Sequence, residues 1–196
     1  MVEVAKLTAP LFSLKASGQL AKTLVYMNWK GIEDVRQYVI PANPKTAAQQ
    51  TQRGYFTNAV DAWHTTGFST LDLTAWNLLA SALKLPASGY NMHMRYYVDA
   101  KVAGKTFTEL HTCAIASITS SGASVSVKVA SDKTGKLYIG TSKTLMATEF
   151  SGSFDTDHYT FTLTDLAAST KYYFYMKNTA VGEEARTGIY TFSTTA

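Results

Sequence analysis

The stretch W-K-G-I-E-D-V-R-Q-Y-V-I-P-A-N-P-K-T-A-A-Q, residues 29–49, decides how the first part of the chain folds. Lys30-Gly31 separates two β-like runs, 22–29 and 32–40, so we expect a β-hairpin here. Pro41 has no backbone N–H to give to a neighbouring strand and therefore ends the second run. The hairpin is thus expected to stop abruptly at a rigid corner.

Beyond this corner the apolar residues recur at helical spacing. Asn43 suits a helix N-cap and Pro44 the first helical position, so a helix is expected to begin here. Ser69, with Asp72 three residues later, is a capping-box start for a second helix, and residues 88–98 suggest a third. We expect the first two helices to pack as an αα-hairpin with their tryptophans in the seam. Their apolar stripes are Phe56, Ala59, Val60 and Trp63, and then Leu73, Trp76, Leu79, Ala80 and Leu83.

Residues 111–196 show another pattern, in which short alternating runs are separated by turns rich in Ser, Gly, Asp and Thr. The runs are 113–118, 124–130, 135–142, 158–163, 171–177 and 188–194. Such a series without helices is typical of a β-sandwich. The charge balance changes at the same place, from eleven Lys/Arg against seven Asp/Glu in 1–110 to seven of each in 111–196. We therefore predict an α+β domain over 1–110, a β-hairpin plus two or three helices, followed by an all-β sandwich over 111–196.

Composition bears on several classes of function. No run approaches the roughly 18 apolar residues of a membrane helix, so we expect no membrane association. The N-terminus lacks the basic segment and apolar core of a secretory signal, so synthesis in the cytoplasm is expected. Cys113 is the only cysteine, which rules out an intrachain disulfide. The net charge of +4 is too mild to predict nucleic-acid binding.

The residue types that carry chemistry are present but scattered. His111 and Cys113 could supply part of a metal site, but such a site needs three or four ligands. The remaining histidines, His64, His93 and His158, lie in unrelated segments. No G-x-S-x-G elbow, P-loop or dinucleotide-binding motif occurs in the chain. We therefore predict no catalytic residue, no metal, no cofactor and no enzymatic activity.

The segment 166–176, L-A-A-S-T-K-Y-Y-F-Y-M, resembles the fibronectin type III pattern L-x-P-x-T-x-Y-x-V-x-V. The resemblance implies a fibronectin type III-like or Ig-like sandwich in which Tyr172 forms the tyrosine corner, its hydroxyl bonded to the chain upstream. It also implies that Phe174 and Met176 continue the inward face of that strand. Ala168 departs from the pattern, because it stands where the family has a proline.

Three tyrosines then form a candidate ligand face. If Tyr172 points inward, the period of two sends Tyr173 and Tyr175 to the outer face of the sheet. Tyr138, on the preceding strand of the same predicted sheet, is expected to join them. Exposed tyrosines suit sugar stacking or a protein interface. The alternative, which the sequence leaves open, is that loops or adjacent subunits cover them.

The first half of the chain resembles small proteins encoded in phage and prophage genomes that are presumed to be virion components. The matching pieces, within residues 18–95, are Trp29-Lys30-Gly31, Val35 to Val39, Pro41 to Thr46, Gln49, Arg53, Phe56, Trp63, Trp76 and Ser88 to Asn91. The resemblance implies a virion structural protein, as capsid decoration, minor capsid or tail-associated protein. Its partners would be major capsid or tail proteins and further copies of itself, and its location the virion.

A candidate assembly interface follows from the strand 20–29, which is largely apolar on both faces and so suits contact with a neighbouring subunit. Its expected members are Leu24, Tyr26, Trp29, Lys30, Arg36 and Tyr38. The rival hypothesis is a carbohydrate-binding host-adhesion module that recognises host surface glycans through the three tyrosines. A DNA-contacting protein inside the particle is a third alternative, and it predicts strongly salt-dependent binding by the first half.

Overall fold

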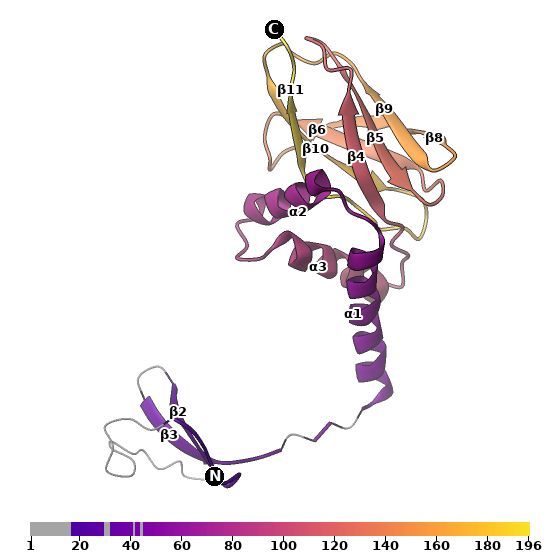
Figure 1. Ribbon diagram of the computed structural model, residues 1–196. Coiled ribbons are helices and arrows are strands. Elements are labelled where there is room, and N and C mark those ends of the chain that lie inside the picture. The colour runs from indigo at the N-terminus through magenta and orange to yellow at the C-terminus, as the bar shows by residue number, and fades with distance from the viewer. Residues whose placement is uncertain (1–16, 30–31, 41, 44) are drawn as a thin grey trace. The chain divides into compact units, whose positions relative to one another are not determined.

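The computed structural model describes residues 17–29, 32–40, 42–43 and 45–196 (Figure 1). The described residues form three helices and eleven strands in three antiparallel sheets. The chain divides into two compact units, Met1–Lys45 (unit 1) and Thr46–Ala196 (unit 2). This division differs from the boundary predicted near residue 110, because the helices belong to the same unit as the sandwich.

Unit 1 contains a three-stranded antiparallel sheet in the order β1-β2-β3. The strands are β1 (Gly18–Leu20), β2 (Leu24–Trp29) and β3 (Ile32–Gln37). The predicted hairpin is confirmed by the pairing of β2 with β3, which runs from Leu24 opposite Gln37 to Trp29 opposite Ile32. The return strand ends at Gln37, three residues earlier than the predicted run.

Helix α1 (Ala47–Thr65) begins later than the sequence predicts. Its N-cap is Thr46, whose hydroxyl accepts a hydrogen bond from the Gln49 N–H at 3.4 Å. Lys45 has a φ of +48°, a left-handed conformation that cannot belong to a right-handed helix. The predicted N-cap at Asn43 is therefore wrong, and Pro44 lies outside the described residues.

Helices α2 (Thr70–Ala82) and α3 (Gly89–Val102) complete the helical part of unit 2. The capping box predicted for α2 is confirmed, because Ser69 and Asp72 each accept a hydrogen bond from the other's backbone N–H. Both α1 and α2 pack chiefly against α3, so the predicted αα-hairpin of α1 with α2 is wrong. The ring of His93 on α3 fills the expected seam, with its centroid 5.3 Å from those of both Trp63 and Trp76.

Two four-stranded antiparallel sheets face each other in the rest of unit 2 (Figure 1). One has the order β4-β5-β9-β8, with β4 (Leu110–Ala116), β5 (Ala123–Val129), β9 (His158–Leu163) and β8 (Ser153–Asp155). The other has the order β11-β10-β6-β7, with β11 (Tyr190–Ser193), β10 (Lys171–Asn178), β6 (Gly135–Gly140) and β7 (Thr148–Ser151). All six predicted runs overlap a strand, whereas no run was predicted at the short strands β7 and β8.

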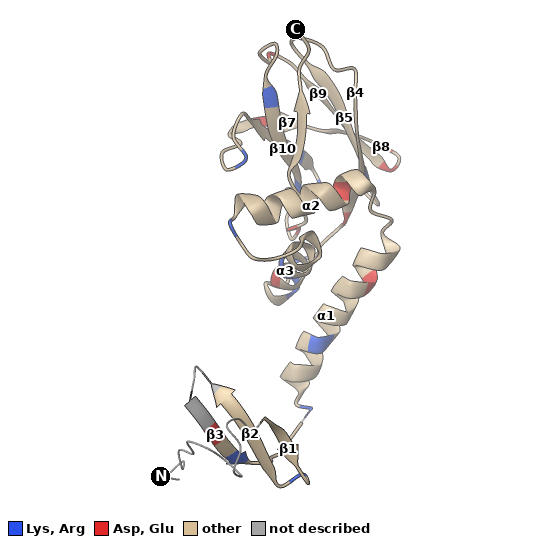
Figure 2. Cartoon of the chain, turned by 60° about the vertical axis from the view of Figure 1, so that its left-hand side comes forward, with Lys and Arg blue, Asp and Glu red and all other residues tan. Residues whose placement is uncertain are grey.

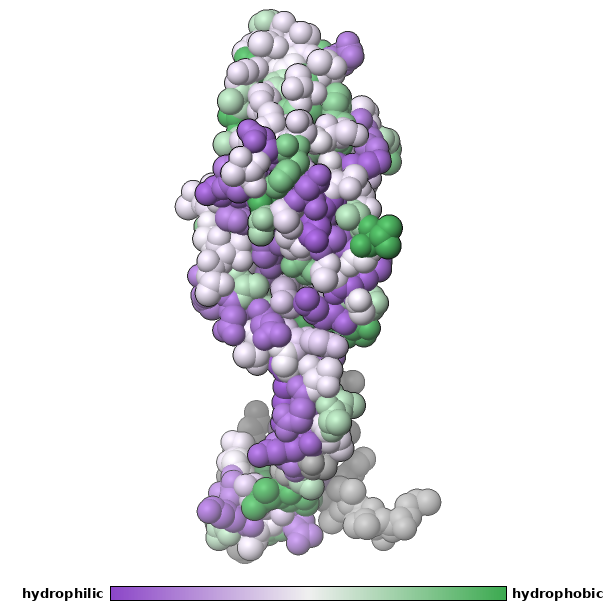
Figure 3. Space-filling view, turned by 90° about the vertical axis from the view of Figure 1, so that its right-hand side faces the viewer, coloured by the Kyte–Doolittle hydropathy of each residue, from purple (hydrophilic) through white to green (hydrophobic). Residues whose placement is uncertain are grey.

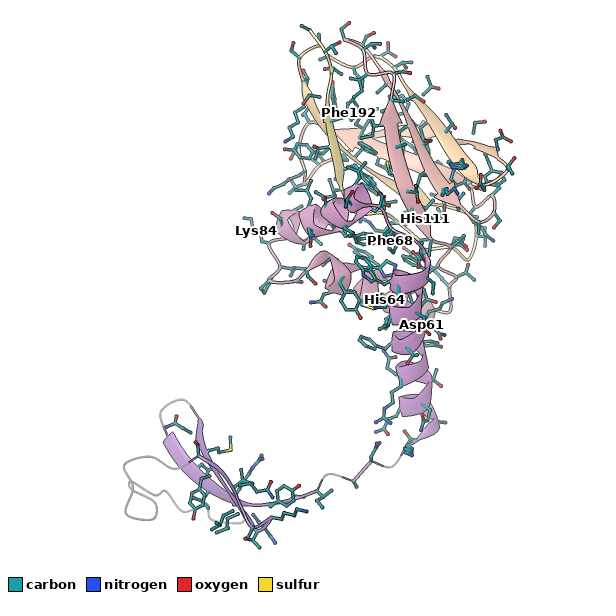
Figure 4. All side chains as sticks on the ribbon, in the orientation of Figure 1. Asp61, His64, Phe68, Lys84, His111 and Phe192 are labelled. Carbon is teal, nitrogen blue, oxygen red and sulfur yellow. The ribbon has the colours of Figure 1, made fainter. Side chains whose placement is uncertain are left out.

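The core of this sandwich follows the alternation of the sequence. Every second residue of β5, β6 and β10 is buried, which places one face of each strand between the sheets. Phe192 of β11 also lies in this core (Figure 4). Its most deeply buried members include Val125, Val127, Leu137, Phe161, Phe174 and Met176.

Helix α2 is built into the sandwich through its backbone. The N–H of Ile189 donates a hydrogen bond to the carbonyl of Ala75 at 2.9 Å. Gly188 comes so close to this turn of α2 that a Cβ on it would overlap the backbone of Ala75 and Trp76. Ile189 is buried among the apolar side chains of α2. These contacts explain why no division of the chain falls near residue 110.

Candidate functional site

The predicted interface residues of unit 1 fall on both faces of its sheet. Leu24 and Tyr26 of β2 share one face, because they alternate with Val25 along the strand. Arg36 is the cross-strand partner of Val25 and therefore belongs to the opposite face. Leu24 and Arg36 are exposed, and Tyr26 and Tyr38 are half-buried. Lys30 and the side chain of Trp29, also predicted members, lie outside what the structure describes.

Apolar side chains are exposed on the described part of unit 1 (Figure 3). Leu20 and Leu24 are 50% and 37% exposed, and they are cross-strand partners in the β1–β2 pair. Val39 and Ile40, which follow β3, are 69% and 76% exposed. None of the residues of this unit whose side chains the structure describes is buried. The sheet therefore presents apolar surface on residues that its own strands do not cover.

In unit 2, the three predicted tyrosines lie on the outer face of the sheet containing β6 and β10. Tyr138 and Tyr175 are cross-strand partners, and their rings stack with centroids 5.1 Å apart and an angle of 18° between planes. Tyr173 packs against the apolar cluster of α2 and Ile189, so the helices cover part of this face. All three tyrosines are half-buried. The face is thus a partly covered aromatic surface, on which Tyr138 and Tyr175 form the stacked pair.

Arg186 completes this surface, and no sequence pattern predicts its position there. Its guanidinium carbon lies 4.3 Å from the ring centroid of Tyr175 and 5.0 Å from that of Tyr96 on α3, within the range of cation–π interactions. Its Nε donates a hydrogen bond to the carbonyl of Thr187 at 3.1 Å. Burial lowers the pKa of Arg186 from its usual value, yet arginine remains charged at neutral pH. Tyr96 and Arg186 are 90 positions apart, so no local pattern reveals their contact.

A hollow of about 320 Å³ opens beside Arg186 and Tyr175. Two cationic side chains, Arg186 and Lys143, contribute to its lining, and no Asp or Glu does. The other lining residues are Leu79, Ala82, Leu83, Thr144, Leu145, Met146, Tyr175 and Ile189. The hollow therefore combines an apolar wall with positive charge, an arrangement that suits a ligand carrying an anionic group on an apolar body.

The other candidates of the sequence do not come together. Among the described residues, no three His, Cys, Asp or Glu side chains are close enough to hold a metal ion. His64 lies at the end of α1 and His111 near the start of β4 (Figure 4). Burial lowers the pKa of the His111 imidazole and, with the charge of Asp72, raises that of the Cys113 thiol. Cys113 is thereby kept as a neutral thiol.

The buried His93 and the half-buried Glu109 form a polar pair that the sequence did not indicate. The His93 Nε2 lies 3.1 Å from a carboxylate oxygen of Glu109, and the His93 side chain has no exposed surface. Aromatic rings surround the imidazole, among them those of Phe68 and Phe107. The pair lies where α1, α3 and the segment before β4 meet, so its evident role is to hold these elements together.

None of the helices in the described part of the chain is long and apolar enough to cross a membrane. Neither a protein-family model nor a curated protein matches the sequence. A solved structure described as "Myokine structure" aligns with 46% of this chain and 100% of its own, at 15% identity and a TM-score of 0.40. The sensor domain of the anti-sigma factor RsgI4 from Pseudobacteroides cellulosolvens aligns with 46% of this chain and 76% of its own, at 20% identity and a TM-score of 0.35. Similarity at this level carries no argument about function.

Proposed function

We propose that the chain is a non-enzymatic structural protein of a virion, in which unit 1 docks on the particle and unit 2 is displayed outward. The observation that carries the proposal is the uncovered apolar surface of unit 1. Its strands span only three, six and six residues, and a small sheet needs a covered apolar face to be independently stable. Contact with another subunit would cover Leu20 and Leu24 and supply the missing packing.

We further infer that the sandwich of unit 2 is fibronectin type III-like or Ig-like. Its strand orders, β4-β5-β9-β8 and β11-β10-β6-β7, correspond to the A-B-E-D and G-F-C-C′ orders of that architecture. The Tyr172 hydroxyl accepts a hydrogen bond from the Ala167 N–H at 2.8 Å, which is the contact of a tyrosine corner. Phe174 and Met176 are fully buried on the inward side of the same strand. A compact unit built around a sandwich of this kind suits display on a particle.

The partners that fit this proposal are other virion proteins and further copies of the chain. Sedimentation velocity of the full-length protein over a range of concentrations tests the self-association. We expect association that Leu24→Asp abolishes, because the new charge would be buried against the neighbouring subunit. Val181→Asp is the matched control, since Val181 is fully exposed on a turn of unit 2. A wild-type protein that stays monomeric at every concentration counts against the proposal.

A second candidate function is host adhesion through surface glycans. It is favoured by Tyr138, which stacks on Tyr175 and is only half-buried, because an accessible aromatic face is suited to packing against a sugar ring. Glycan-array binding that is lost in Tyr175→Ala and Tyr173→Ala, and retained in a Tyr55→Ala control on α1, would support this function. If the protein binds no glycan on the array, the structural role is the only one of the two candidate functions that stands.

A further inference from the structure

The side chain of Arg186 is held by two tyrosines and a backbone carbonyl. The ring centroids of Tyr175 and Tyr96 lie 4.3 and 5.0 Å from the guanidinium carbon, and the Nε–H donates a hydrogen bond to the Thr187 carbonyl. A guanidinium fixed in this way directs its remaining N–H groups in its own plane, which is the geometry that binds a carboxylate through two parallel hydrogen bonds. These contacts restrict the movement of Arg186 and use only its Nε–H in a hydrogen bond to the backbone.

No carboxylate of the described residues forms an ion pair with Arg186. The adjacent Glu184 is engaged elsewhere, by Lys105 and by Lys177, whose Nζ lies 3.1 Å from its carboxylate. A half-buried cation without an acidic partner is poorly compensated, since its hydration is reduced and no opposite charge replaces it. An anion that enters the hollow would supply that charge.

The other residues that line the hollow indicate which chemical group of the ligand lies next to the anion. Its accessible apolar lining is Met146, Leu83 and Leu145, of which the last two are 46% and 68% exposed, whereas Leu79 and Ile189 are buried. Aliphatic side chains gain from contact with another aliphatic group, because both surfaces leave water. A sugar ring would instead require several hydrogen-bonding side chains, and Thr144 is the sole uncharged polar side chain of the lining other than the Tyr175 hydroxyl.

We propose that the hollow beside Arg186 binds a segment of a partner protein in which a carboxylate side chain adjoins a large aliphatic one. The carboxylate pairs with Arg186 in the plane of its guanidinium, and Lys143 adds a second positive charge at the rim. The aliphatic side chain packs against Leu83, Leu145 and Met146. This binding site belongs to unit 2 and is independent of the docking proposed for unit 1.

The test is a titration of the isotope-labelled full-length protein, followed by NMR chemical shifts, with capped dipeptides as probes. The acetylated and amidated dipeptide Leu-Glu is compared with Leu-Gln, which removes the charge alone, and with Gly-Glu, which removes the aliphatic group. We expect Leu-Glu to shift the resonances of Tyr175, Arg186 and Ile189. Leu-Gln should bind at least about tenfold more weakly, as expected for loss of a close charge pair.

Substitutions in the protein provide the second part of the test. Arg186→Gln should weaken Leu-Glu binding by about tenfold or more, while the matched control Arg95→Gln, on an exposed part of α3, should change it less than about twofold. If Arg186→Gln does not fold, Lys143→Gln still tests the proposal, because Lys143 is exposed and its replacement should not affect folding. Lys143→Gln should weaken Leu-Glu binding by a smaller factor than Arg186→Gln.

Equal affinity for Leu-Glu and Leu-Gln would overturn the proposal, and so would the absence of any shift at the hollow. Preferential binding of glucuronic acid over Leu-Glu would overturn the peptide assignment and favour an acidic glycan. None of these results depends on whether the chain is a virion protein, so failure here is distinguishable from failure of the docking proposal.

Discussion

The hydroxyl of Tyr190 donates a hydrogen bond to Oδ1 of Asp72 at 2.7 Å, joining residues that are 118 positions apart. The same carboxylate accepts hydrogen bonds from the Thr112 and Cys113 N–H groups and from Ser69 at the start of α2. Figure 2 shows this acidic residue as the one charged position on α2. Because Asp72 is fully buried, it serves as a polar joint between the helix and two strands of the sandwich.

We predict that Asp72→Asn destabilises the protein by about 2–4 kcal/mol, because the amide turns an N–H₂ group toward donors and leaves buried groups unsatisfied. Urea denaturation measures the change in the free energy of unfolding. Asp61→Asn, on the exposed side of α1, is the control and should stay within about 0.5 kcal/mol of the wild type. If both substitutions changed the free energy of unfolding equally, the hydrogen bonds of Asp72 would not be what holds α2 to the sandwich.

Two glycine substitutions should act in opposite directions. Gly188→Ala places a methyl group into the backbone of α2, so we predict destabilisation of at least about 2 kcal/mol. Gly54→Ala lies within α1 with no atom near its new Cβ, and it should stabilise the protein by about 0.5–1 kcal/mol through its helix propensity. Thermal unfolding measures both. A Gly188→Ala protein as stable as the wild type would contradict the close approach of α2 to the sandwich.

Stability at alkaline pH should depend on Tyr159. Its hydroxyl donates a hydrogen bond to Asp132 at 2.7 Å, and burial raises the pKa of Tyr159 to about 12, above the value of about 10 in an unfolded chain. The stabilisation from this shift is therefore complete below about pH 10 and is lost as the pH rises toward 12. We predict that Tyr159→Phe is less stable at neutral pH but loses stability less steeply over that window. Urea denaturation of both proteins between about pH 10 and 12 measures this difference. If the stability of the two proteins fell in parallel over this range, the pH dependence would not come from Tyr159.

Much of the local structure could be predicted, because its determinants are close together in the sequence. The alternation of residues 171–177 gives β10 and the outward direction of Tyr173 and Tyr175. The capping pair of Ser69 and Asp72 gives the start of α2. The start of α1 was misplaced, since nothing in the sequence shows that Lys45 adopts a left-handed conformation.

The candidate site in unit 2 could be predicted only in part. Tyr138 and Tyr175 were found because β-strand periodicity orients them, but Arg186 and Tyr96 meet through tertiary packing alone. The compact units divide after Lys45 and not near the predicted boundary for the same reason. Residue 110 marks a real change from helix to strand, yet Asp72 and Ala75 contact the sandwich across it.

The most direct test of the central claim is to count copies of the chain in purified virus particles by quantitative mass spectrometry. The account predicts a fixed number of copies per particle for the wild type. It also predicts that Leu24→Asp, in unit 1, removes the chain from particles, while Val181→Asp, in unit 2, leaves its copy number unchanged. Particles that carry none of the wild-type chain would contradict the proposal that it is a structural component of the virion.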